Sequence, residues 1–234
     1  NFRLAKKDLL VVFLLSLLRA TTSFSLLIAY QNIATGVAST IHFMYPLAVS
    51  LAMMFFFHEK KSLLVMLAVL MSLFGAALLS SGELEAKSGD TIVGLVAACI
   101  SVFSYGGYII GVRITRAAQI NSTVLTCYVM GMGAVFYLIG AMATSGLHLV
   151  TDGYIWLIIL GLALPATAIS NITLVRAIKY AGPTLTSILG AMEPLTAVVI
   201  GVFVFKELFT LNSAIGILLI LLAVGMVVFR KQKS

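Results

Sequence analysis

Residues 35–59 read TGVASTIHFMYPLAVSLAMMFFFHE, an apolar run interrupted near its middle by a histidine and a proline. Residues 183–207 repeat the design as PTLTSILGAMEPLTAVVIGVFVFKE. A shift of 148 positions pairs Pro46 with Pro194, Met44 with Met192, Leu47 with Leu195 and Glu59 with Glu207. Two copies of an apolar segment, each broken by proline at mid-length, are typical of a transporter built from two repeats.

The composition around these segments is that of a membrane protein. Of the 234 residues, 61% are apolar and 10% are charged, and the mean hydropathy is +1.13. A soluble domain carries about 25% charged residues. The net charge of +7 would suggest nucleic acid as the partner of a soluble protein. Here the basic residues flank apolar runs, so we expect the lipid bilayer and not nucleic acid as the partner.

The number of membrane helices follows from the length of the apolar runs, since about 20 apolar residues cross a bilayer. The sequence predicts eight helices, at residues 9–30, 35–57, 62–81, 91–112, 121–144, 153–175, 183–205 and 209–229. The connections are short, so neighbouring helices should run antiparallel. We therefore expect an all-α polytopic fold.

The basic residues predict the orientation, because cytoplasmic loops are enriched in Lys and Arg. One set of alternate connections holds Lys87 and Lys206 and includes an acidic loop at 82–90. The other set, with both ends of the chain, holds Arg3, Lys6, Lys7, Lys60, Lys61, Arg113, Arg116, Arg176, Lys179, Arg230, Lys231 and Lys233. Both termini are therefore expected in the cytoplasm.

This orientation makes the two copies point in opposite directions through the membrane. The three helices predicted within residues 1–82 match the last three within 91–230. The two helices predicted at 91–112 and 121–144 have no counterparts, and their counterparts would precede residue 1. We therefore expect eight helices of a ten-helix bundle, with 1–82 as the end of a first repeat and 91–230 as a complete second repeat.

Two longer segments carry a family resemblance. LLIAYQNIATGVASTIHFMYPLAVSLAMMFFFHEK at 26–60 resembles the signature segment of the EamA branch of the drug/metabolite transporter superfamily. LVRAIKYAGPTLTSILGAMEPLTAVVIGVFVFKE at 174–207 resembles its second copy. The resemblance covers nearly the whole chain and implies ten helices in inverted repeats around a central cavity. It implies transport without specifying the substrate.

The prolines are candidate hinges. A proline within a helix removes one backbone donor and leaves the carbonyl four residues earlier without its usual partner. Pro46 is expected to free the carbonyl of His42, and Pro194 that of Gly190. These groups would form hinges and a polar wall of a substrate site. The alternative is a structural kink without a role in transport.

Arg19 and Glu193 are the charged residues deepest in the predicted spans. An ionisable group at mid-bilayer costs several kcal/mol unless it is paired or hydrated. Both are expected at a similar depth, facing one cavity, where Glu193 would take up a proton or a cationic group and Arg19 would hold a carboxylate. The alternative is a static ion pair that fixes helix packing.

Further residues are candidates for the lining of the cavity. His42 can titrate near neutral pH, and Tyr45 occupies the position that Glu193 has in the other copy. Polar side chains at helical spacing should point away from lipid. Some of them are expected only to join helices. The remaining candidates are Ser23, Ser104, Tyr105, Tyr108 and Asn171.

The sequence favours a secondary transporter that exports small metabolites or amino-acid-like solutes, with protons as a possible coupling ion. No phosphate-binding loop or metal-ligand spacing is readable, so no cofactor or metal is expected. A membrane enzyme or receptor using the same cavity is the alternative, although no convincing catalytic set is readable. A channel is disfavoured because no charged ring or filter-like loop is readable. The expected location is the bacterial inner (plasma) membrane.

Overall fold

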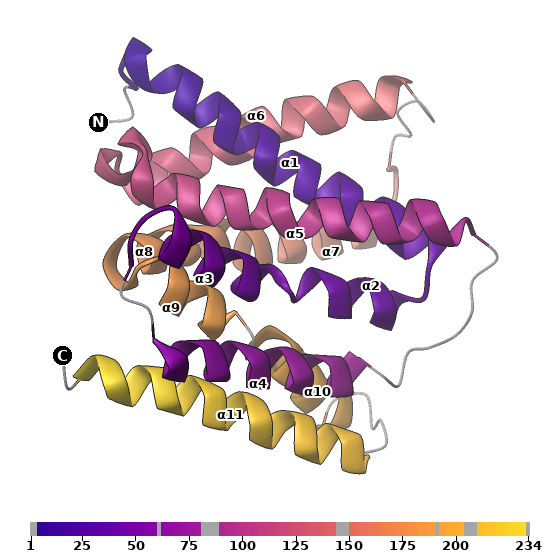
Figure 1. Cartoon of the computed structure of the whole chain (residues 1–234). Helices are drawn as coiled ribbons and strands as arrows, with labels where there is room; N and C mark the ends of the chain where they lie inside the picture. Colours follow the sequence, from indigo (N-terminus) through magenta and orange to yellow (C-terminus); the bar gives the residue numbers. More distant parts are fainter. Residues whose placement is uncertain are drawn as a thin grey trace. The chain divides into compact units, whose positions relative to one another are not determined.

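The computed structural model describes residues 4–59, 62–80, 89–143, 150–190, 192–203 and 210–232, and every regular element in these ranges is helical (Figure 1). The predictions for Arg3, Lys60, Lys61, Lys87, Lys206, Glu207 and Lys233 lie outside them. The helices are η1 (Lys6–Asp8), α1 (Leu9–Asn32), α2 (Thr35–His42), α3 (Tyr45–Phe55), α4 (Leu63–Ser80), α5 (Thr91–Ile114), η2 (Arg116–Gln119), α6 (Ser122–Ala143), α7 (Gly153–Gly161), η3 (Leu162–Ile169), α8 (Ser170–Ala181), α9 (Pro183–Leu189), α10 (Met192–Phe203) and α11 (Leu211–Gln232).

The helices have the length and composition of membrane-spanning segments. Two shorter apolar helices cover Leu63–Leu78 and Ala214–Met226. Five helical stretches within the described residues can cross a membrane by length and composition, namely Lys6–Asn32, Thr35–Phe55, Thr91–Ile114, Ser122–Met142 and Gly153–Ala181. The expectation of a polytopic helical membrane protein is confirmed, while the number of eight membrane helices stays a prediction.

The two proline-containing segments are each divided into two helices. Residues 43–44 separate α2 from α3, and Gly190 follows α9 in a turn before α10. Pro46 is the second residue of α3 and Pro194 the third of α10, and both are buried. Proline is tolerated in the first turn of a helix because an amide N–H there has no intrahelical acceptor. Each proline therefore lies in the first turn of the second half of its segment instead of interrupting a continuous helix.

The helix boundaries repeat along with the sequence. Shifting residue numbers by 148 moves the first residues of α2 and α4 onto the first residues of α9 and α11. The matched residues are Thr35 with Pro183 and Leu63 with Leu211. The internal repeat thus extends from residue identities to the positions at which these helices start.

The segment predicted as one helix at 153–175 runs on to Ala181 and contains a π-helical stretch, η3, around Pro165. Proline lacks the N–H and crowds the carbonyl four residues earlier, so a regular α-helix cannot continue through it. A wider turn relieves this conflict, as in other π-bulges. The hydroxyl of Thr167 donates to the carbonyl of Leu162 at 3.0 Å, which adds a partner at the distorted turn.

The chain forms two compact units. Unit 1 comprises Asn1–Ala20 and Gly111–Gly182, and unit 2 comprises Thr21–Ile110 and Pro183–Ser234. The helices α1 and α5 contribute to both units. These units divide the chain differently from the repeats expected at 1–82 and 91–230, and that domain assignment stays a prediction.

Unit 1 is organised around α6, which packs against α8. The rings of Phe13 and Phe136 meet edge to face with centroids 5.7 Å apart. The guanidinium Nε of Arg116 lies 3.0 Å from the Asp8 carboxylate, which ties η2 to η1. Aromatic packing and this ion pair thus connect the first helical turns of the chain to the segment after residue 111.

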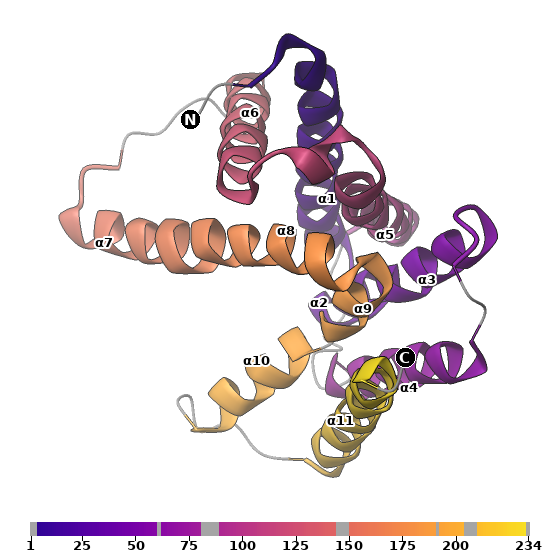
Figure 2. The ribbon, with the colours of Figure 1, turned by 90° about the vertical axis from the view of Figure 1, so that its left-hand side faces the viewer.

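Unit 2 is organised around α4 and α11, which lie side by side (Figures 1 and 2). A methyl group on Gly75 would come within 2.8 Å of the Gly216 carbonyl oxygen, so the two backbones are in close contact. Ala68 of α4 belongs to the same buried cluster as Ala223 of α11. Later residues of α4 thus meet earlier residues of α11, so the two helices are antiparallel.

Candidate substrate site

An aromatic cluster of unit 2 gathers four of the predicted site residues. His42 ends α2, Tyr45 begins α3, and Tyr105 and Tyr108 lie on α5. The imidazole centroid is 5.6 Å from the Tyr45 ring and 5.4 Å from the Tyr105 ring. Tyr45 and Tyr105 meet edge to face at 4.7 Å, and Tyr105 and Tyr108 stack at 6.4 Å. The break between α2 and α3 therefore lies directly against α5.

A hydrogen bond to Ser101 indicates which ring nitrogen of His42 carries the proton in the neutral imidazole. The Nδ1 atom of His42 lies 2.9 Å from the Ser101 hydroxyl oxygen. That hydroxyl donates its own proton to the carbonyl of Ala98 at 2.6 Å. A serine hydroxyl has one proton to donate, so its oxygen accepts from His42. The neutral imidazole therefore carries its proton on Nδ1, and Nε2 is its basic nitrogen.

The two helix breaks meet at Tyr45 and Gly190. Tyr45 is 2% exposed, and its hydroxyl occupies the space that a Cβ on Gly190 would need. Such a Cβ would also lie 3.0 Å from the ring carbon that carries the hydroxyl. Glycine at position 190 thus permits the close approach, and α3 packs directly on α9. The sequence placed both residues in the site but did not reveal that they touch.

The carbonyl of Gly190 corrects one expectation from the sequence. Pro194 was expected to leave this oxygen without a partner, but the backbone N–H of Glu193 donates to it at 3.0 Å. The segment closes into a tight turn at residue 190, and the bond from residue i+3 replaces the one that proline removes from residue i+4. Glu193 itself is exposed and lies within electrostatic range of Tyr45.

The polar residues of α1 and α5 also meet in unit 2. The hydroxyl of Thr22 donates to that of Ser104 at 3.0 Å, and Ser104 donates to the Ile100 carbonyl at 2.7 Å. Ser104 is therefore engaged in joining two helices. Ser23, the neighbouring candidate, is half-buried on α1.

Arg19 and Asn171 are the predicted site residues that belong to unit 1. Arg19 is half-buried on α1, and Asn171 is buried on α8. The Asn171 amide donates to the Thr167 carbonyl at 2.7 Å. Since Arg19 belongs to unit 1 and Glu193 to unit 2, their predicted pairing stays a prediction.

Sequence reasoning missed three polar residues of unit 2. The Thr184 hydroxyl donates to the Glu59 carboxylate at 2.5 Å, which joins the chain after α3 to the start of α9. The hydroxyls of Ser50 and Thr186 are buried and have no hydrogen-bond partner among the described residues. Ser50 and Thr186 are polar residues within apolar stretches, and this pattern could have identified them as candidates. Nothing in the sequence indicated that Thr184 and Glu59 would meet.

The comparisons with known proteins agree with this architecture. The model of the EamA-like transporter family matches residues 92–229. One solved protein, described only as a crystal structure of a protein, superposes with a TM-score of 0.82 at 18% sequence identity. The match covers 100% of this chain and 80% of that one, and at this identity it establishes the fold alone. The comparison with curated proteins returned no match.

Proposed function

Because the chain belongs to the EamA-like transporter family, part of the drug/metabolite transporter superfamily, we propose that it is a secondary transporter that exports small metabolites or amino-acid-like solutes. The observation that carries this proposal is the contact between the two proline-containing breaks, where Tyr45 packs on Gly190. Discontinuous helices that meet near mid-membrane are the usual substrate sites of transporters with inverted repeats. The family is one of transporters, which disfavours the enzyme alternative.

The proposed mechanism is alternating access by rocking of two oppositely inserted repeats. The antiparallel packing of α4 and α11, which are equivalent under the shift of 148, supports opposite insertion. Pro46 and Pro194 are the hinges, because each lies in the first turn of a helix that is separate from the helix before it. In this mechanism both termini are cytoplasmic, and all eight helices span the plasma membrane.

The repeat suggests where a proton would bind. Under the shift, Tyr45 corresponds to Glu193 and His42 to Gly190. Exchanging each residue of the pair Tyr45 and Gly190 for its equivalent in the other repeat gives the pair Glu193 and His42. Twofold symmetry between the repeats would bring these two residues together in the same way. We assign this second pair as the proton site, with the Glu193 carboxylate facing His42 Nε2. The rings of two further titratable residues, Tyr45 and Tyr105, pack against the imidazole.

The substrate in this proposal contacts the remaining candidates. Tyr45, Tyr105 and Tyr108 provide aromatic surface and hydroxyl groups, which suit a small solute with both apolar and polar parts. Ser23 and Ser104 add hydroxyls from α1 and α5. The Arg19 guanidinium is proposed as the anchor of a substrate carboxylate, and Asn171 as a further polar contact.

A counterflow experiment in proteoliposomes tests the proposed function. Vesicles containing the protein are loaded with one of a panel of amino acids and small organic acids, and uptake of the same labelled compound is followed. A carrier gives saturable uptake that unlabelled internal substrate accelerates. Flux that neither saturates nor responds to internal substrate would favour a channel. Conversion of the compound without movement would favour an enzyme.

The proton site is tested in the same vesicles with Glu193→Gln. We expect uptake by this variant to lose its dependence on an imposed pH gradient while counterflow without a gradient persists. Thr196→Val is the matched control, since Thr196 is exposed on the same helix and, among the described residues, its hydroxyl bonds to the Met192 carbonyl alone, at 2.8 Å. An unchanged response of Glu193→Gln to pH removes Glu193 from the coupling mechanism.

A further inference from the structure

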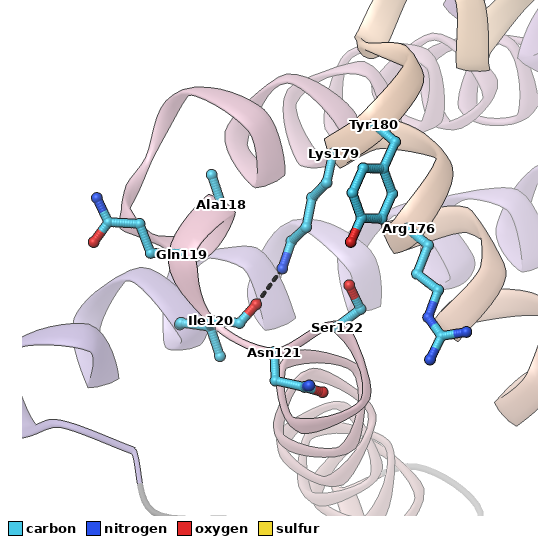
Figure 3. Close-up of a pocket in the computed structure, with 8 residues that line it drawn as sticks. All are labelled: Ala118, Gln119, Ile120, Asn121, Ser122, Arg176, Lys179 and Tyr180. Atoms are coloured by element: carbon cyan, nitrogen blue, oxygen red, sulfur yellow. Dashed lines mark hydrogen bonds between the residues drawn. The ribbon is translucent and has the colours of Figure 1, made fainter.

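A cavity of about 400 Å³ lies in unit 1, and its lining includes none of the residues assigned to transport (Figure 3). One wall is the segment 118–122, which runs from the end of η2 to the first residue of α6. The other wall is the last turn of α8, with Arg176, Lys179 and Tyr180. Figure 3 shows the Lys179 and Tyr180 side chains extending from α8 toward the 118–122 segment. The cavity thus brings two cationic side chains together with the amide and hydroxyl groups of a loop.

The charge of this cavity suits an anion. No carboxylate is among the described residues that line it. Asp8, which belongs to the same unit, pairs with Arg116 at 3.0 Å. Arg113 adds a third cation, since its guanidinium donates to the Lys179 backbone carbonyl at 2.6 Å. Several cations held in place without a matching carboxylate favour binding of a negatively charged group.

The donors around the cavity are arranged for more than one hydrogen bond. The Lys179 ammonium donates to the Ile120 carbonyl, which fixes its position. An ammonium has three N–H donors, so two more can serve a ligand. The exposed Arg176 guanidinium supplies a planar set of donors that suits phosphate oxygens. Ser122 and Asn121 supply further polar groups from the loop.

The position along the helices indicates where the anion comes from. Ser122 begins one candidate membrane span, and Ala181 ends another. A cavity at the ends of two spans lies at the depth of lipid headgroups. The Tyr180 side chain, 87% exposed, is typical of the aromatic residues found at that depth. Basic cavities between membrane helices are known binding sites for anionic headgroups.

From these observations we infer a binding site for a phosphate group, supplied by the headgroup of an anionic phospholipid. Arg176 and Lys179 contact the phosphate oxygens, and Tyr180 packs beside the glycerol and the start of the acyl chains. The site does not depend on the proposed transport mechanism, because none of its residues belongs to the aromatic cluster or to the helix breaks.

Native mass spectrometry of the protein purified in neutral detergent tests this site. The protein is titrated with phosphatidylglycerol or with phosphatidylcholine, and lipid occupancy is measured. A parallel titration with inorganic phosphate, read by thermal unfolding, distinguishes a soluble phosphate from a lipid. The test variant is Arg176→Gln. The matched control is Lys7→Gln, which removes one charge from an exposed residue of η1 in the same unit.

We expect the wild type to retain phosphatidylglycerol in preference to phosphatidylcholine, and Arg176→Gln to weaken this binding by about tenfold, as expected for the loss of one charged hydrogen-bonding group. Lys7→Gln should bind like the wild type, and both variants should unfold at an unchanged temperature. Equal retention of the two lipids, or equal binding by Arg176→Gln and wild type, overturns the site. Stabilisation by inorganic phosphate without lipid selectivity overturns the assignment to a lipid.

Discussion

The hydroxyl of Tyr45 lies where the first side-chain carbon of any residue other than glycine at position 190 would stand. Position 45 begins the helix after one break, and position 190 lies in the turn of the other. This contact therefore sets how closely the two proline-containing segments approach. It also explains why an aromatic residue and a glycine occupy these positions.

Replacing Gly190 by Ala should destabilise the protein. The added methyl group overlaps the Tyr45 hydroxyl, and overpacking of this kind costs about 1–3 kcal/mol. We expect a lower midpoint of thermal unfolding in detergent. The double variant Gly190→Ala with Tyr45→Phe should recover much of the loss, because the overlapping oxygen is gone.

Gly133→Ala is the matched control for this substitution. Gly133 lies within α6, and a Cβ there would meet nothing within 4 Å. Alanine is favoured over glycine in a helix by about 0.5–1 kcal/mol, so this variant should be neutral or stabilised. If Gly190→Ala unfolds at the wild-type temperature, the packing of Tyr45 on Gly190 does not limit the approach of the two segments.

The hydrogen bond between Thr184 and Glu59 should stabilise unit 2. Thr184→Val removes the donor, and we expect the free energy of unfolding to fall by about 1 kcal/mol. This value is at the low end for a hydrogen bond to a charged group, because Glu59 is exposed. Chemical or thermal unfolding measures this loss. Thr173→Val is the control, since the exposed Thr173 hydroxyl bonds, within the part of the chain that the structure describes, to the Ile169 carbonyl of its own helical segment alone. Equal stabilities of the two variants would argue against the contribution of Glu59.

Ser101 should determine the tautomer of His42. In Ser101→Ala the Nδ1 proton loses its acceptor, so the two neutral tautomers should become closer in energy. Nitrogen NMR of histidine-labelled protein at alkaline pH reports which ring nitrogen is protonated. The wild type should show a proton on Nδ1, and the variant a mixture. A proton on Nε2 in the wild type contradicts the assigned geometry. In the proposed mechanism, uptake by Ser101→Ala falls as well.

Ser50 is expected to tolerate truncation. Its hydroxyl is buried without a hydrogen-bond partner among the described residues, and such a group costs about 1–3 kcal/mol relative to a satisfied one. Ser50→Ala should therefore be as stable as the wild type or more stable. The control Ser72→Ala removes a bond to the Val69 carbonyl at 2.9 Å and should be the less stable of the two. A marked loss of stability in Ser50→Ala would indicate that the hydroxyl has a bound partner, such as a buried water.

Much of the fold could be predicted from the sequence. The apolar runs predicted the helices, because length and apolar composition are local properties. The two prolines predicted the breaks, since the missing N–H acts within four residues along the chain. Around Pro165 the same local rule applied, but the chain formed a π-helical stretch instead of a break. Proline forbids a regular helix there without specifying which irregular backbone replaces it.

The sequence by itself determined the helical membrane class of the protein and the two segments in which proline disturbs a helix, because these follow from residues close together in the chain. The tertiary structure alone decided which side chains meet. His42 bonds to Ser101 across 59 positions, and Thr184 bonds to Glu59 across 125. Such pairs depend on how helices pack, and no local propensity specifies the partner that packing brings into reach.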